Sequence, residues 1–87
     1  MSDLEVKGLI YETEQEIREI SEAIRKNVDR VRSLSMQLSW SQDGFSIFNL
    51  GHQLMGLKRE VEKGVDLHET LKTLLLHQTE LKKKIIS

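Results

Sequence analysis

The chain has no cysteine and no proline, and aromatic residues make up only 5% of it. The absence of cysteine excludes disulfides and cysteine-ligated metal sites, and nothing points to an oxidising compartment, so a cytoplasmic location is expected. No segment reaches the ~20 consecutive apolar residues that a membrane-spanning helix needs. The first residues carry acids where a signal peptide would carry bases. We therefore expect an intracellular protein that does not associate with membranes.

The chain also lacks an excess of either charge. Its 13 Lys and Arg residues against 14 Asp and Glu residues give a formal net charge of -1. Such a chain has no long-range field that attracts a polyanion, so nucleic acid is not an expected partner. Abundant charge with few aromatics and no proline favours long solvated helices and an all-α fold. At 87 residues the chain is a single domain with a marginal core, so partner chains are expected.

Apolar residues recur every seven positions in the first half of the chain. One heptad position, a, holds Ile10, Ile17, Ile24, Val31 and Leu38, and position d holds Val6, Thr13, Ile20, Asn27 and Leu34. The opposite positions are nearly all polar, which predicts a coiled-coil-like helix over about residues 3–38. Ser2 and Glu5 form the capping box expected at its start.

Asn27 interrupts the apolar row at position d. A buried asparagine at such a position fixes the register and the number of helices, at a cost in stability. Alternatively, Val28 takes the inward position and Asn27 lies at the edge of the row. On the sequence we favour the second interpretation.

Turn-forming residues follow the first helix, and the run from Ser39 to Gly44 predicts a bend over residues 39–45. Two apolar rows come after it, and they are out of step at Gly64. A break there would give helices over about 46–63 and 67–85, whereas a local stammer would keep one long helix. We favour the kink or break, because Gly64 can end one helix and Asp66 can begin the next.

The two arms have similar lengths, which favours an antiparallel hairpin with Ile10 near Leu74 and Ile24 near Val61. A single hairpin cannot cover all the apolar residues, since Leu74, Leu75 and Leu76 lie on more than one side of their helix. The leading architecture is therefore a dimer of two hairpins that forms a four-helix bundle. A kinked monomeric three-helix bundle is the second architecture.

Two sets of residues are predicted to make interfaces. The self-assembly seam consists of Ile10, Ile17, Ile20, Ile24, Val31, Leu34, Leu38, Leu50, Leu54, Leu57, Val61, Leu67, Leu71, Leu74 and Leu81. The candidate partner surface consists of Met36, Trp40, Phe45, Phe48, Met55, Leu75 and Leu76, because exposed Trp, Phe and Met are typical of interaction hot spots. For the residues around the bend we favour the simpler interpretation that they plug the open end of the bundle.

No motif indicates catalysis, a cofactor or a metal ion. His52, His68 and His77 have no partner at ligand spacing, and the glycines do not form a phosphate-binding loop. The serines around the bend lack a base and an orienting group for nucleophilic catalysis. We therefore expect no enzymatic activity and no cofactor.

These patterns favour a non-enzymatic interaction module, an oligomeric helical hairpin that acts as an adaptor, scaffold or chaperone-like partner of another helical protein. The alternative is a dimeric regulator that contacts nucleic acid through a local basic patch. That patch consists of Arg25, Lys26, Arg30 and Arg32.

Overall fold

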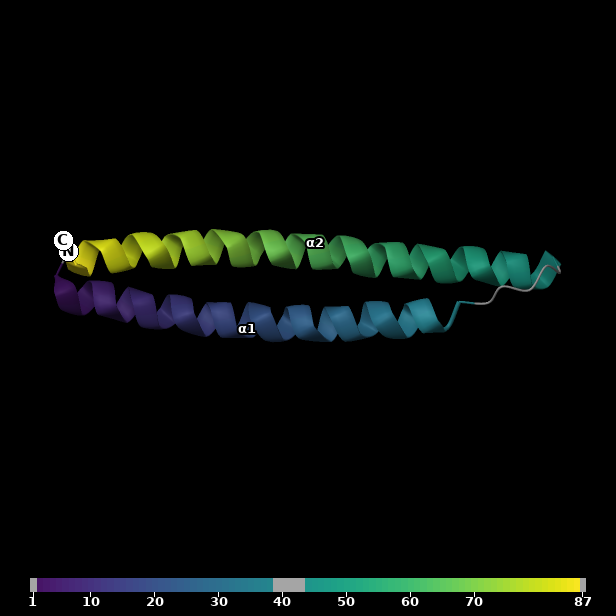
Figure 1. The fold of residues 1–87 in the computed structure, drawn as a ribbon, viewed down its shortest axis with the longest axis horizontal. Coiled ribbons are helices and arrows are strands. Elements are labelled where there is room, and N and C mark those ends of the chain that lie inside the picture. Colours follow the sequence, from purple (N-terminus) through teal and green to yellow (C-terminus); the bar gives the residue numbers. More distant parts are fainter. Residues whose placement is uncertain (1, 39–43, 87) are drawn as a thin grey trace.

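The computed structural model describes the backbone of residues 2–38 and 44–86 and the side chains of 2–38 and 48–85. It contains two helices, α1 (Asp3–Met36) and α2 (Gly44–Ile86), and no strand in these ranges. The helices run antiparallel side by side, with the two chain ends together (Figure 1). The molecule measures 67 × 14 × 13 Å. The prediction of an all-α antiparallel hairpin is confirmed.

The start of α1 is the predicted one. The Ser2 hydroxyl oxygen accepts a hydrogen bond from the Glu5 backbone N–H at 3.2 Å, so it satisfies one of the free donors of the first turn. Asp3 and Glu5 lie in that turn, where negative charge suits the helix dipole. At the other end, α1 stops at Met36, slightly before the predicted boundary.

The inward face of α1 follows the heptad positions a and d, and position d holds its three buried residues, Val6, Thr13 and Asn27. Asn27 is only 6% exposed, whereas Val28 is 42% exposed. The interpretation that Val28 replaces Asn27 in the inward position is therefore wrong. Successive residues lie about 100° apart around a helix, so burying Asn27 turns Val28 outward to one side of the hairpin.

The expected break at Gly64 is absent, because α2 runs through this residue without interruption. Its more buried residues recur at alternating spacings of three and four. They are Leu50, Gln53, Leu57, Glu60, Gly64, Leu67, Leu71, Leu74, Gln78, Leu81 and Ile85, and Asn49 and Gly56 beside this row are also partly buried. The apparent slip came from following Leu54 and Val61, whose apolar side chains lie outside this row. Because Gln53, Glu60 and Gly64 face inward instead, one register holds throughout, and the predicted helices 46–63 and 67–85 are one.

The register of the two arms also differs from the predicted one. Ile24 opposite Val61 would place Asn27 beside Lys58, but Asn27 instead lies against Glu60 and Gly64. Near the chain ends, Gln78 donates a hydrogen bond to Glu14 across the interface. The arms are therefore displaced by about one helical turn. Helix α1 ends at Met36 and α2 already begins at Gly44, so the predicted bend over residues 39–45 lies too late in the chain.

The two helices have unequal lengths, 34 residues for α1 and 43 for α2. At 1.5 Å per residue, about 13 Å of α2 has no part of α1 opposite it. Figure 1 shows that this overhang is the N-terminal part of α2, beyond the end of α1. Phe48 lies there, 64% exposed, with its ring edge-on to His52.

Gly64 on α2 lies directly against Asn27 on α1. A Cβ atom at this position would overlap the Asn27 side-chain oxygen. At Gly8, on α1, a Cβ would meet nothing within 4 Å. Gly64 therefore has a packing role that Gly8 does not have, and a helix-weakening residue is retained in the middle of α2.

We predict opposite effects for the same substitution at these two glycines. Gly8→Ala should raise the free energy of unfolding by up to about 1 kcal/mol, since alanine has the higher helix propensity. Gly64→Ala should lower it by about 1–3 kcal/mol, because Asn27 must move and lose its hydrogen bond. Urea denaturation followed by circular dichroism measures both values. In the Asn27→Ala background, Gly64→Ala should no longer lower the free energy of unfolding. If Gly64→Ala stabilises the natural chain, the contact between Asn27 and Gly64 does not limit the packing.

Candidate functional site

A polar cluster surrounds Asn27 at the middle of the hairpin. The Asn27 amide Nδ2 donates to the Glu60 backbone oxygen at 2.8 Å and to the Glu60 carboxylate Oε1 at 3.3 Å. The other carboxylate oxygen, Oε2, pairs with Arg30 Nε at 3.3 Å. The Glu60 side chain is only 15% exposed, so these partners compensate for the loss of hydration of its charge. The cluster ties α1 to α2 at one register.

A second polar position lies towards the chain ends. The Thr13 hydroxyl is buried and donates to the Leu9 backbone oxygen at 2.7 Å, so its own helix satisfies it. Gln78 donates through Nε2 to Glu14 Oε1 at 3.4 Å across the interface. Every buried side-chain nitrogen and oxygen in the described part of the chain has a partner. The interior therefore holds no unsatisfied polar atom there that would mark a ligand site.

An apolar groove lies on one side of the hairpin, next to the Asn27 cluster. We call it the valine groove; it is lined chiefly by Val28, Val31, Val61, Gly64, Val65 and His68. Its volume is about 500 Å³, and Glu69 and Lys72 also line it, with opposite charges. The groove exists because Gly64 has no side chain and the valines are short. It is open to solvent, with Val61 and Val65 about half exposed.

His68 is held in one orientation at the side of this groove. Its Nδ1 lies 2.7 Å from the Gly64 backbone oxygen. A carbonyl oxygen can only accept, so Nδ1 carries the proton and donates, and Nε2 remains directed away from the helix backbone. The ring therefore presents its carbon edge and one nitrogen to whatever covers the groove.

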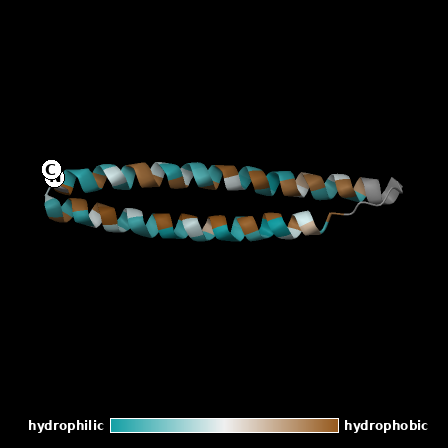
Figure 2. Cartoon of the chain, viewed as in Figure 1, coloured by the Kyte–Doolittle hydropathy of each residue, from teal (hydrophilic) through white to brown (hydrophobic). Residues whose placement is uncertain are grey.

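A second apolar row continues the groove along α2. Leu54, Val61, His68 and Leu75 recur every seven residues, each one position after a residue of the inward row. Leu54, Val61 and Leu75 are all at least 44% exposed. We call these four residues the outer row. Figure 2 shows hydrophobic segments at intervals along the coloured part of α2.

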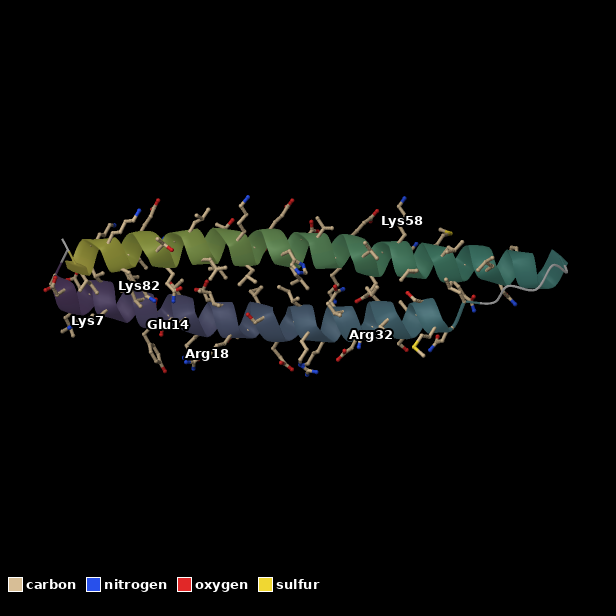
Figure 3. All side chains as sticks on the ribbon, in the orientation of Figure 1. Lys7, Glu14, Arg18, Arg32, Lys58 and Lys82 are labelled. Carbon is tan, nitrogen blue, oxygen red and sulfur yellow. The ribbon has the colours of Figure 1, made fainter. Side chains whose placement is uncertain are left out.

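The structure places most, but not all, of the predicted seam between the arms. Thirteen of its members are partly or fully buried within the hairpin, whereas Leu54 and Val61 belong to the exposed outer row. Side chains from both helices fill the space between them (Figure 3). The seam is thus largely used within one chain, and its use in self-assembly stays a prediction.

The predicted partner surface is dispersed along the molecule. Met36, Phe48 and Met55 are exposed near the bend, and Leu75 and Leu76 are exposed far along α2. Trp40 and the side chain of Phe45 lie outside the described residues. Leu75 and Leu76 line a shallow groove with His68, which adjoins the valine groove. Sequence reasoning missed Val28 and Val65, although the seven-residue spacing of the outer row was a signal for this face.

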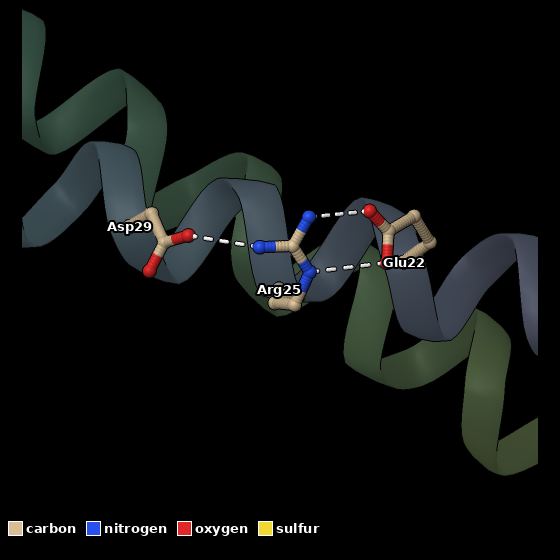
Figure 4. A network of polar contacts seen from close by, with 3 residues as sticks. All are labelled: Glu22, Arg25 and Asp29. Atoms are coloured by element: carbon tan, nitrogen blue, oxygen red, sulfur yellow. Dashed lines mark hydrogen bonds and ion pairs between the residues drawn. The ribbon is translucent and has the colours of Figure 1, made fainter.

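The basic patch of the alternative hypothesis is partly neutralised. Arg25 Nε donates to Glu22 Oε2 at 3.1 Å, and its Nη1 pairs with Asp29 Oδ2 at 3.3 Å (Figure 4). Arg30 pairs with Glu60. These contacts direct two of the four cations towards carboxylates of the same chain, so less charge remains for phosphate groups.

The remaining candidates for chemistry are isolated. In the described residues, no three histidine or acidic side chains come together in a way that could hold a metal ion. His52 contacts Phe48, and His68 is hydrogen-bonded to Gly64. No helix in the same part of the chain is long and apolar enough to cross a membrane.

Neither a protein-family model, nor a curated protein, nor a solved structure matches this chain.

The pKa of Glu22 should depend on Arg25. The hydrogen bond from Arg25 holds the pKa of the Glu22 carboxyl below its usual value, and desolvation opposes this effect. The pair stabilises the fold only at pH values where Glu22 is ionised, and this contribution is lost as the pH falls through the lowered pKa. Because the pair is exposed, the effect on stability is small.

We predict that Arg25→Gln raises the titration midpoint of the Glu22 carboxyl, measured by carbon-detected NMR. Arg32→Gln removes the same charge two to three turns further along α1 and should leave the midpoint unchanged. Equal shifts in both variants would mean that net charge, and not the direct pair, sets the pKa.

Proposed function

We propose that this protein is a non-enzymatic interaction module that associates through the apolar surface its hairpin leaves exposed. The proposed assembly is a homodimer in the form of a four-helix bundle. The remaining apolar surface would serve another helical protein, in the role of an adaptor, scaffold or chaperone-like partner. The observation that carries this proposal is the large surface area of the single hairpin.

The area can be compared with that of a compact monomer. The hairpin exposes 6782 Å² for a mass of 10.1 kDa. A typical folded monomer of this mass exposes roughly 5,300 Å², so the hairpin has an excess of roughly 1,500 Å². A standard protein interface removes about 800 Å² from each partner. The excess therefore suffices for one full interface and leaves further surface for a second contact.

The composition of the exposed surface supports the same proposal. Among the described side chains, Val6 and Leu81 are the only fully buried apolar ones. Eleven of the described large apolar residues are exposed, and on α2 three of them belong to the outer row. Apolar side chains arranged along one face of a helix are the usual basis of helix-to-helix recognition. An interaction module needs no catalytic group, and no three histidine or acidic side chains in the described part of the chain come together as a candidate metal site.

The proposal predicts that folding and association are coupled. On dilution from high to low micromolar concentration, the mass from light scattering should fall from dimer to monomer. Helicity from circular dichroism on the same samples should decrease in parallel, because two helices alone bury too little to stay folded.

Trifluoroethanol offers a control for this measurement, since it restores helicity without restoring mass. A chain that remains fully helical and monomeric at every concentration would contradict the proposed self-association. A dimer whose helicity is independent of concentration would contradict only the coupling of folding to association.

A further inference from the structure

The valine groove is a built feature of the hairpin and not a defect of packing. Asn27 requires a residue without Cβ at position 64, and the resulting gap is flanked by Val28, Val31, Val61 and Val65. A larger side chain at position 64 would overlap Asn27, so this position cannot fill the gap. The hydrogen bonds of Asn27 therefore lie on the inside of the hairpin, and the apolar valine groove lies beside them.

To be covered, the valine groove needs apolar side chains from outside the hairpin. Its volume of about 500 Å³ corresponds to several aliphatic side chains, more than a single inserted residue would fill. Along the groove, the outer row continues in both directions with Leu54 and Leu75. The occupant must therefore be elongated, as a helix or a pair of helices is.

The charges around the groove favour a neutral occupant. Glu69 and Lys72 contribute one charge of each sign. A strongly acidic or basic helix would gain no net attraction here, whereas a copy of the same face would meet no net repulsion.

The face around the groove is formed by both helices. On α2 the outer row has leucines at its two ends, Leu54 and Leu75. On α1, Ser21 and Ser35 lie one heptad to either side of Val28, a lining residue of the groove. A two-fold axis would bring this same face of a second hairpin against it, so that the two valine grooves meet.

From these observations we propose that the valine groove is the dimer interface, and that a second copy of this chain covers it. The roughly 1,500 Å² of excess area per chain exceeds the about 800 Å² that each partner contributes to a stable dimer. This inference rests on the proposed self-association and adds its location: the face of Val28, Val61 and Val65, and not the overhang of α2 at Phe48.

The test uses one aspartate substitution in the groove and a matched one outside it. Val65 is 53% exposed in the single hairpin, so Val65→Asp disturbs little within one chain. In a dimer it would bury a carboxylate, and dissociation should become roughly 100-fold more favourable. Leu4→Asp makes the same change at an exposed position in the first turn of α1, and the dimer should keep its natural dissociation constant. Light scattering over a dilution series measures both.

If Val65→Asp fails to fold, a second measurement tests whether the valine groove is the dimer interface. The chain has no cysteine, so Val65→Cys and Leu4→Cys each introduce a single thiol. Maleimide should label the Val65→Cys thiol at least roughly tenfold more slowly in the dimer than after dilution to the monomer. Labelling of the Leu4→Cys thiol should proceed at one rate throughout.

The outcomes separate the two proposals. A natural dimer that survives Val65→Asp, together with rapid labelling of the Val65→Cys thiol, overturns the groove as the interface while self-association stands. Loss of the dimer in Phe48→Asp, with Val65→Asp still dimeric, would move the interface to the overhang. A natural chain that is helical and monomeric overturns both proposals, and a helix of another protein is then the remaining occupant.

Discussion

The hydrogen bonds of Asn27 across the hairpin are the interaction on which the rest of the structure depends. Its amide reaches a backbone oxygen of α2 that the helix itself leaves accessible, and it occupies the space above Gly64. A slip of either helix by one turn would place a side chain of α2 where Gly64 now leaves room for Asn27. Aliphatic side chains along the rest of the interface are interchangeable in comparison, since one apolar contact replaces another. The polar contact selects the register, and the apolar contacts stabilise it.

The same contact determines the outer surface. With the register set, Glu60 and Gly64 occupy inward positions and Val61 and Val65 are displaced to the side. Glycine at 64 lowers the helix propensity of α2 and opens the groove beside it. The contact between Asn27 and Gly64 therefore has two consequences: it selects the register of the two helices, and it leaves an apolar surface on the outside of the hairpin. This coupling is a physical reason to regard the groove as functional surface.

A molecule of two helices is too thin to bury many side chains completely. A body 14 × 13 Å in cross-section cannot surround any side chain with several layers of neighbours. Even the inward row is mostly half-buried, and fully buried apolar residues in the described ranges are limited to Val6 and Leu81. Stability and function are linked for this reason, because the surface that would recognise a partner is also the surface whose burial would stabilise the fold. Neutral overall charge fits such a role, since short-range packing and not long-range attraction would select the partner.

The amino-acid sequence by itself determined the helices of this protein, the start of α1 at Ser2 and the antiparallel hairpin. These follow from local causes: seven-residue periodicity, a capping side chain and turn-forming residues between two arms of similar length. Only the tertiary structure decided the continuity of α2 and the inward position of Asn27, and only it revealed the valine groove. At Gln53, Glu60 and Gly64 the inward position carries a polar residue or a glycine, while an apolar residue follows each of them. Periodicity alone therefore selects the wrong neighbours there. The choice is made by the opposite helix, because Asn27 can be satisfied only where α2 offers both a carbonyl oxygen and the space of a missing side chain.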